Sequence, residues 1–238
     1  GAEVPVGSYA TYVPELDSIA YGKPVTFRPF INAYQYMKYD AEKNEYSNRS
    51  IIFKSWKDEA IDAKGGVRCG KIPAKELANL SEEERAKQKA IKCYRLIYGL
   101  VSFDGVLPGG ADAHVSNLPV LWKVTGSNFK PVGEAIESLR RRGKVMFNHT
   151  LTLKTKKKKA GSNVFYVSDI TVDKDEVSFT DTEKETLLSF QETINTENEE
   201  IVELWRQAKK AEPVAVKASE AKAIDAEIED DPIEVLSS

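Results

Sequence analysis

The fold is decided by residues 144–172, which read KVMFNHTLTLKTKKKKAGSNVFYVSDITV. Apolar and polar side chains alternate from Lys144 to Lys154, which is the period of a β-strand with one buried face. A lysine-rich turn region follows at 156–161, and the chain returns over Val164–Val172 as a partner strand. The stretch therefore predicts a long β-hairpin whose tip carries four consecutive lysines, Lys156–Lys159.

Further strand patterns occur upstream of this hairpin. Between Val25 and Tyr39 five odd positions are apolar and should face a core, whereas the even positions mix aromatic rings with cations; the five are Val25, Phe27, Ile31, Ala33 and Met37. Pro29 interrupts this run, so we expect an edge strand or a bulge there. Shorter segments are predicted as strands at Ser50–Lys57, Tyr94–Phe103 and Leu118–Val124, as a strand or loop at Val67–Ile72, as a polar turn at Asp40–Asn48 and as a loop at Asp104–His114.

Three helices are predicted from their start signals and apolar periodicity. Pro73 precedes a helix of about 18 residues, which begins or restarts at the capping box of Ser81 and Glu84. A short helix is expected at Pro131–Arg142. A capping box of Thr180 and Glu183 opens a long amphipathic helix that reaches about Lys210. Its apolar residues recur every seven positions, at Leu187, Ile194, Ile201 and Ala208.

These elements indicate a mainly β protein with some helix, in a chain of 238 residues that can bury a core without metal or disulfide support. We predict an OB-like antiparallel β-barrel with inserted short helices and a long C-terminal amphipathic helix. An α+β sandwich with its helices on one side is the alternative. The expected domains are an OB-like nucleic-acid-binding domain over 1–180, the amphipathic helix over 181–212 and an acidic flexible tail over 213–238.

Charge is distributed unevenly along the chain, although the net charge is only −3. Residues 1–168 hold 27 lysines and arginines against 17 acidic residues, whereas residues 169–238 hold 7 against 20. The two parts therefore carry balances of +10 and −13. A basic body with an acidic C-terminal third is typical of proteins that handle a polyanion. The alternative is a solvated body beside a solvated tail.

The residues of common catalytic and metal sites do not form a recognisable pattern. Cys69, Cys93, His114 and His149 match no recurrent zinc spacing, and no nucleophile turn accompanies His114. His149 falls on the apolar side of a strand, where a hydrogen-bonded core histidine is the expected role. No phosphate-binding loop of the Gly-Lys-Ser/Thr type is present. We therefore predict a protein that is not an enzyme, with no cofactor and no metal.

Several segments combine cations with aromatic rings, the mixture that phosphates and unpaired bases require. Each segment also has a simpler explanation, because aromatic residues favour strands and lysines at a hairpin tip prevent edge pairing. Their coincidence in a basic body favours nucleic-acid binding. The predicted binding residues are Arg28, Phe30, Tyr34, Tyr36, Lys38, Lys54, Trp56, Arg140, Arg141, Arg142, Lys144, Lys154, Lys156, Lys157, Lys158 and Lys159.

This layout resembles the phage-type and bacterial single-stranded DNA-binding proteins, which join a basic oligonucleotide-binding barrel to an acidic C-terminal tail. The resemblance implies a tail that competes with DNA for the groove and docks replication proteins, through Glu227, Glu229, Asp230 and Asp231. Residues 230–233, Asp-Asp-Pro-Ile, look like the acidic, proline-containing tip of the bacterial members. Those tips end in an aromatic residue, which is absent from residues 234–238, and the long helix is not part of the bacterial barrel.

The expected function is therefore single-stranded DNA binding in phage replication or recombination, through a basic aromatic groove that the tail regulates. An RNA-binding or polymerase-accessory factor stays open, because no site for a 2′-hydroxyl can be recognised in the sequence. A structural or interaction protein that assembles, also as a homo-oligomer, through its long helix stays open as well. Residues 1–18 lack the basic and apolar regions of a secretory signal, so we expect a cytoplasmic protein, in the host cytoplasm if the source is a phage.

Overall fold

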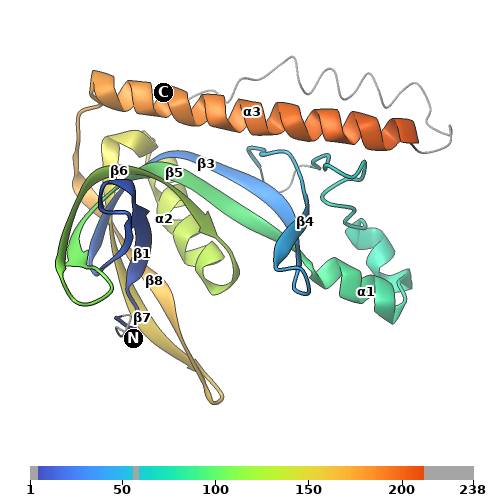
Figure 1. Cartoon of the computed structure of the whole chain (residues 1–238), viewed down its shortest axis with the longest axis horizontal. Helices are drawn as coiled ribbons and strands as arrows, with labels where there is room; N and C mark the ends of the chain where they lie inside the picture. The colour runs from blue at the N-terminus through green and yellow to red at the C-terminus, as the bar shows by residue number, and fades with distance from the viewer. Residues whose placement is uncertain (1–4, 56–58, 212–238) are drawn as a thin grey trace. The chain divides into compact units, whose positions relative to one another are not determined.

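The computed structural model describes residues 5–55 and 59–211. Within these residues the strands form one antiparallel sheet in the order β1-β2-β5-β3-β7-β8, with β4 paired to β3 and β6 paired to β5 (Figure 1). The predicted class, mainly β with a few helices, is confirmed. The sheet is open, so the predicted barrel is not confirmed.

The strands are β1 (Tyr9–Val13), β2 (Ser18–Gly22), β3 (Val25–Asp40), β4 (Glu45–Arg49), β5 (Ile91–Val106), β6 (Asp112–Val124), β7 (His149–Ala160) and β8 (Asn163–Glu176). The α-helices are α1 (Glu82–Lys89), α2 (Phe129–Arg141) and α3 (Asp181–Ala211). Short 3-10 turns lie at Pro14–Leu16, Ala74–Asn79, Gly126–Asn128 and Met146–Asn148.

The chain divides into two compact units, which are described separately below. Among the described residues, unit 1 contains 5–32 and 96–187, and unit 2 contains 33–55, 59–95 and 188–211. Strands β3 and β5 and helix α3 each contribute one part to each unit. The body predicted over 1–180 thus holds parts of both units, and the helix predicted over 181–212 is shared by them.

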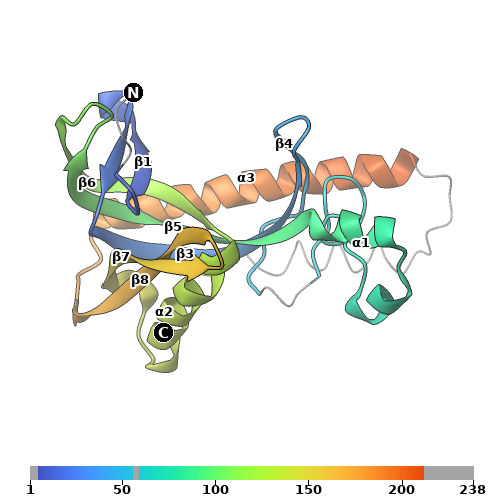
Figure 2. The ribbon, with the colours of Figure 1, turned by 90° about the horizontal axis from the view of Figure 1, so that it is seen from below.

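Unit 1 is built around an apolar core in which sheet residues meet helix α2. Phe27 of β3 and Leu151 of β7 are buried there, and Trp122 of β6 contacts the Phe27 ring edge-on at 5.7 Å between ring centroids. Helix α2, which lies beside β8 (Figure 2), buries Val132, Ile136 and Leu139. This i, i+4, i+7 spacing is the apolar stripe of an amphipathic helix, so the predicted short helix is confirmed with a start two residues earlier.

The long hairpin of unit 1 is confirmed, but its turn lies further along the chain than predicted. Residues 146–148 form a 3-10 turn, and β7 starts only at His149. The strand then continues through Lys156–Lys159 to Ala160, which pairs with Asn163. The four lysines are therefore paired strand residues and not the tip, and the chain turns at Gly161 and Ser162 (Figure 1). Gly161 has φ +61°, a left-handed conformation that glycine adopts without strain.

Strands β5 and β6 extend further into unit 1 than predicted. Glycines and a proline between Asp104 and His114 favour a loop in the sequence analysis. The loop expected over Asp104–His114 is reduced to 107–111, and β6 begins at Asp112. Ala113 and Val115 are buried in alternation with exposed residues, as in a strand with one covered face. Gly105 belongs to β5, where a Cβ atom would collide with the Tyr21 carbonyl of β2. Close strand packing, and not a turn, therefore requires this glycine.

In unit 2 the segment between β3 and α1 differs most from the prediction. The residues expected to form a polar turn contain β4, and the strand expected at Ser50–Lys57 is replaced, in its described part, by isolated bridges such as Tyr34 to Phe53. Residues 67–72 are a loop, the alternative that the sequence left open. The helix expected after Pro73 is split into a 3-10 turn at 74–79 and α1. The predicted capping box is confirmed, since the Ser81 hydroxyl accepts from the Glu84 backbone and the Glu84 carboxylate accepts from the Ser81 backbone.

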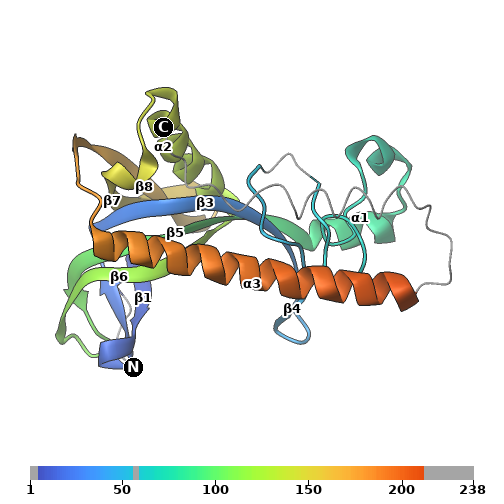
Figure 3. The same ribbon diagram turned by 90° about the horizontal axis from the view of Figure 1, so that it is seen from above.

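The part of α3 that belongs to unit 2 runs alongside the segment after β4 (Figure 3). The Asn198 side chain bonds both backbone groups of Ile52, accepting from its N–H at 2.7 Å and donating to its carbonyl at 3.0 Å. Ile194 and Ile201 are completely buried in this unit. None of the described helices is long and apolar enough to cross a membrane.

Candidate nucleic-acid interface

The even-numbered face of β3, predicted to offer exposed rings, is buried. Tyr34 and Tyr36 of unit 2 are only 6% and 3% exposed. The Tyr36 ring stacks on Phe53 with 5.5 Å between centroids and 13° between planes, and burial is the largest cause that raises its pKa. Arg68 and Lys71 lie over the same ring, at 5.4 and 5.1 Å. The prediction that these rings are open to bases is therefore wrong, because protein groups already cover them.

Arg28 and Phe30 occupy the same face of β3 in unit 1, and they are buried too. Arg28 donates from Nε to the Phe147 carbonyl and from Nη2 to the Ser178 carbonyl, each at 2.7 Å, and from Nη1 to the Glu183 carboxylate. Burial lowers the pKa of the Arg28 guanidinium, and the nearby Glu183 charge partly offsets this effect. Each nitrogen of the guanidinium is thus bonded to the protein, so the prediction of an exposed phosphate-binding Arg28 is wrong.

These bonds place Arg28 at the start of α3. Glu183 also accepts from the Thr180 backbone N–H at 2.7 Å, while the Thr180 hydroxyl accepts from the Glu183 backbone, which confirms the predicted capping box. Phe179, the preceding residue, meets the Phe30 ring edge-on at 5.4 Å. Arg28 and Phe30 therefore connect the first half of β3 to the N-terminus of α3.

The other predicted residues of unit 2 are spread over separate segments. Lys38 is partly exposed near the end of β3 and lines a pocket that is described below, and Lys54 is exposed in the segment after β4. Trp56 lies outside the described residues, and so do the tail residues Glu227, Glu229, Asp230 and Asp231. Their predicted roles stay predictions.

The predicted arginine cluster of unit 1 lies at the C-terminal end of α2, where all three side chains are exposed. Arg140 is bonded to Glu137, one helical turn earlier, in a surface ion pair. Lys144 donates to Glu176 of β8 at 2.5 Å, and this bond and charge lower the pKa of the Glu176 carboxyl. Arg141 and Arg142 form no ion pair within the described part of the chain. Only part of this cluster is therefore available to a ligand.

The hairpin is where the structure gathers predicted cations on exposed positions. Lys154 and Lys156–Lys159 are all exposed along β7. Lys156 is paired with Asp169 of β8, at 2.9 Å between Nζ and Oδ1. Among residues 5–55 and 59–211, Lys157, Lys158 and Lys159 have no ion-pair partner. Three adjacent ammonium groups therefore face solvent at the outer end of the hairpin.

The partner strand supplies aromatic rings that the sequence analysis did not single out. Phe165 is directly opposite Lys158, and Tyr166 is opposite Lys157. Opposed residues of an antiparallel pair point to the same side, so each ring shares a face with a lysine. Phe165 is 36% exposed, while the Tyr166 ring is partly covered beside Lys23, whose Nζ lies 5.9 Å from its centroid. The turn Ala160-Gly161-Ser162-Asn163 fixes this register. Its glycine was the feature of the sequence from which the pairing of Phe165 with Lys158 could have been predicted.

A second exposed aromatic group lies in unit 2 and was also missed. Tyr39 and Tyr46 of the β3–β4 pair meet edge-on at 5.5 Å, and Tyr46 meets Tyr94 edge-on at 6.1 Å. Tyr39 and Tyr46 are 40% and 46% exposed. Burial, followed by the contact with the Tyr46 hydroxyl, raises the pKa of Tyr94 to about 12. Because the three rings contact one another edge-on, less of their surface is free to stack on a base. This group is therefore a secondary candidate for base binding.

The residues considered for catalysis or metal binding do not converge. The described residues contain no group of three or more histidine, cysteine or acidic side chains that could hold a metal ion. His149 is buried as predicted, but within the described residues neither ring nitrogen has a hydrogen-bond partner, and Nε2 lies 3.7 Å from Glu176. The exposed His114 bonds Asp104 at 2.6 Å. Cys69 is buried, and burial raises the pKa of its thiol.

No protein-family model, curated protein or solved structure matches this chain.

Proposed function

We propose that this protein binds single-stranded DNA through the outer part of the β7–β8 hairpin. The observation that carries this proposal is the placement of Phe165 opposite Lys158, on a hairpin whose other face carries Lys157 and Lys159; none of the three lysines has an ion-pair partner among the described residues. A strand bound there has its phosphates near the ammonium groups and one base on the Phe165 ring. Stacking of this kind needs an unpaired base, because a duplex hides the base faces.

The charge distribution supports a polyanionic ligand in preference to a protein partner. The first 168 residues carry an excess of ten positive charges. Lysines that neutralise phosphates release counterions, and this release drives binding without regard to sequence. The acidic last third of the chain supplies an intramolecular competitor, as the resemblance to single-stranded DNA-binding proteins implies. Protection of single strands in replication or recombination is the cellular role that we propose on this basis.

The alternative of assembly through the long helix is weakened by burial. Leu187 is buried in unit 1, and Ile194 and Ile201 are buried in unit 2, so three of the four residues of the seven-residue stripe are already covered by this chain, and Ala208 is partly covered. A helix that joins subunits needs such a stripe on its surface.

The predicted oligonucleotide-binding barrel belongs to the proposal and not to the described fold, because no pairing of β8 with β1 closes the sheet among the described residues.

The test is a titration of the full chain with labelled dT, rU and duplex oligonucleotides at two salt concentrations. We expect dT to bind more tightly than the duplex, with an affinity that falls steeply as salt rises. Equal binding of dT and rU would place RNA beside DNA as a ligand. An absence of binding to every oligonucleotide at low salt would exclude the proposed function.

The hairpin is tested by the triple substitution Lys157→Ala, Lys158→Ala and Lys159→Ala. Each phosphate contact to a single strand contributes about 0.7 to the slope of log affinity against log salt, so the slope should flatten by up to about 2. The matched control replaces the exposed Lys75, Lys89 and Lys92 of unit 2 by Ala, which removes the same charge. Equal losses in the two triple variants would mean that net charge, and not the hairpin, determines binding.

A further inference from the structure

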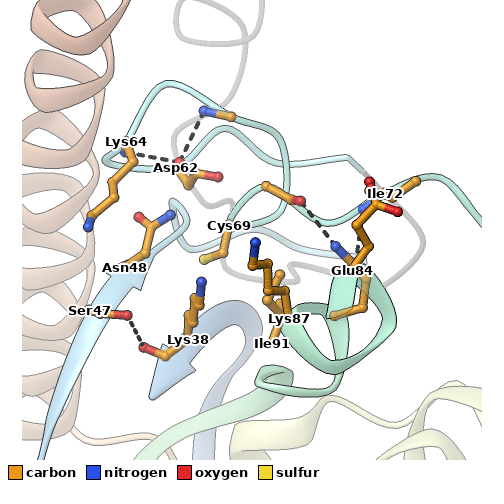
Figure 4. Close-up of a pocket in the computed structure, with 13 residues that line it drawn as sticks. Lys38, Ser47, Asn48, Asp62, Lys64, Cys69, Ile72, Glu84, Lys87 and Ile91 are labelled. Atoms are coloured by element: carbon orange, nitrogen blue, oxygen red, sulfur yellow. Dashed lines mark hydrogen bonds between the residues drawn. The ribbon is translucent and has the colours of Figure 1, made fainter. Parts of the chain in front are cut away.

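Unit 2 contains a pocket that the strand-binding proposal does not use. Its volume is about 340 Å³, and its walls come from the end of β3, the β4 strand, the loop 62–72 and α1. This size is at the lower end of the range for small-molecule sites, so the pocket suits one small ligand and not a polymer that passes through. Figure 4 shows that the side chains of Lys38 and Lys87 point toward the Cys69 thiol in the middle of the site.

Three lysines from three different segments line this pocket. Lys38 comes from β3, Lys64 from the loop and Lys87 from α1. Lys87 is paired with Glu83, at 2.8 Å on the exposed side of the helix, and Glu84 is a second acidic neighbour. Neither Lys38 nor Lys64 forms an ion pair with any residue in the described part of unit 2. Ammonium groups gathered in a concave site attract an anion, and a phosphate monoester provides several strong acceptor oxygens.

The pocket also contains a buried acceptor that lacks a donor. Asp62 is fully buried, and its Oδ1 accepts from the backbone N–H groups of Lys64 and Gly66, at 2.9 and 3.1 Å. Its Oδ2 has no hydrogen-bond partner among the described residues. A buried carboxylate oxygen without a donor is costly, and a ligand N–H or O–H removes that cost. The pocket therefore favours a ligand that carries both a phosphate group for the lysines and a hydroxyl or amino donor for Asp62.

The remaining walls are suited to the flat, apolar part of a ligand. Ile72 and Ile91 line the pocket together with Gly66 and Gly70. A Cβ atom built on Gly70 would meet no protein atom within 4 Å, whereas one on Gly66 would meet Asp62 Oδ2 at 3.0 Å. The Gly70 backbone fills the space beside Gly66, whereas the position beside Gly70 is open, so the flat part of a ligand has room next to Gly70.

We propose that this pocket binds one phosphorylated nucleoside, with its phosphate on Lys38 and Lys87 and a base or sugar donor on Asp62. The nucleoside is either a free nucleotide or the phosphorylated end of a strand, since both present the same chemistry. A metal ion is a poorer occupant, because, of the two carboxylates that line the site, Glu84 is already bonded to Ser81 and Asp62 lies among lysines. The inference does not rest on the hairpin, whose residues belong to unit 1.

The experiment is isothermal titration calorimetry of the full chain with dAMP, dCMP, dGMP and dTMP, compared with the four nucleosides and with inorganic phosphate. At least one monophosphate should bind, with an affinity at least about tenfold higher than that of its nucleoside or of phosphate alone. Short dT oligonucleotides with a 5′-phosphate or a 5′-hydroxyl then show whether the ligand is a free nucleotide or the phosphorylated end of a strand. A stronger binding of the phosphorylated form assigns the pocket to strand ends, and equal binding assigns it to free nucleotides.

Two variants connect the result to the pocket. Lys38→Ala and Asp62→Asn should each weaken nucleotide binding about tenfold, while Lys89→Ala, on the same helix as Lys87 but outside the pocket, should not change it. Asp62 also bonds the backbone of its own loop, so thermal unfolding must show that Asp62→Asn remains folded. Lys38→Ala tests the proposal independently of this loop. No heat with any monophosphate, equal affinity for phosphate alone, or wild-type affinity in Lys38→Ala would each overturn the proposal. The hairpin variant should retain nucleotide binding, so the two proposals can fail separately.

Discussion

The even face of β3 and the outer part of the β7–β8 hairpin contain the same kinds of residue in opposite settings. Arg28, Phe30 and Tyr36 on β3 are buried, and their polar groups and rings contact other parts of the protein. Lys158 and Phe165 on the hairpin are exposed and lie opposite each other. Cations beside aromatic rings thus hold the fold together in one region and are open to a ligand in the other.

The difference shows that composition alone does not identify a binding surface. What separates the two regions is whether the hydrogen-bonding and stacking capacity of each side chain is already used within the chain. The guanidinium of Arg28 donates to two backbone carbonyls and one carboxylate, which leaves it little capacity for a phosphate. The three outer lysines of β7 have all their donors directed to solvent, as far as the described residues extend.

The largest expected effect is on stability and comes from Arg28→Ala. This change leaves the Glu183 carboxylate and two backbone carbonyls without their donor in a buried setting. Removal of one partner from a buried ion pair costs about 3–5 kcal/mol, so the free energy of unfolding should fall by about that amount. Urea unfolding of the full chain, followed by circular dichroism, measures it.

Arg142→Ala is the matched control for this variant, because Arg142 is exposed and forms no ion pair within the described chain. Its free energy of unfolding should stay within about 0.5 kcal/mol of that of the wild type. If Arg28→Ala kept its stability and lost affinity for dT instead, Arg28 would be a ligand contact and the contrast between β3 and the hairpin would disappear.

Much of the fold could be predicted because its signals are local. The alternation in 149–154 predicts β7, the two Ser/Thr–Glu boxes predict the starts of α1 and α3, and the i, i+4, i+7 stripe predicts α2. The failures arise where a distant segment decides the outcome. Strand β3 is covered on its even face by Phe53, Phe147 and Phe179, and a strand covered on both faces carries large residues on both. Its alternation alone therefore could not distinguish a covered face from an open one.

The candidate site was predicted in part for the same reason. The lysines of β7 could be recognised by charge, whereas Phe165 becomes visible only when the hairpin register is known. The pocket of unit 2 had no signal in the sequence, because Lys38, Asp62 and Lys87 come from three segments that only the folded chain brings together.

The next effect is on binding and comes from Phe165→Ala. Loss of one stacked base costs about 1–3 kcal/mol, so affinity for dT should fall between about fivefold and about 150-fold. Stability should change little, because the ring is exposed near the end of the hairpin. Fluorescence anisotropy with labelled dT measures the affinity.

Tyr36→Ala should change stability and not base stacking, because the Tyr36 ring is buried. The loss of a buried ring should lower the free energy of unfolding by about 3–5 kcal/mol.

The smallest expected effect concerns the acidic segment 214–238, which carries 7 acidic residues and 2 lysines. A polyanion on the same chain acts at a high effective concentration, so it competes with DNA for the exposed lysines of β7. If the segment occupies them about two thirds of the time, deletion of 214–238 should tighten dT binding about threefold. The gain should shrink as salt rises, because screening weakens the attraction between the segment and the lysines.

A full-length variant in which the seven acids are replaced by their amides is the matched control, since it keeps the length of the segment. Both variants should tighten binding equally, and the triple lysine variant should gain nothing from the same deletion, because it lacks the surface for which the segment competes. Anisotropy titrations at matched low salt compare all five proteins: the wild type, the deletion, the amide variant, and the triple lysine variant with and without the deletion. If the deletion left the affinity for dT unchanged in the wild-type background, the acidic segment would not compete for the hairpin. The exposed lysines of β7 would then be open to DNA at all times, and their contrast with the bonded cation of β3 would be complete.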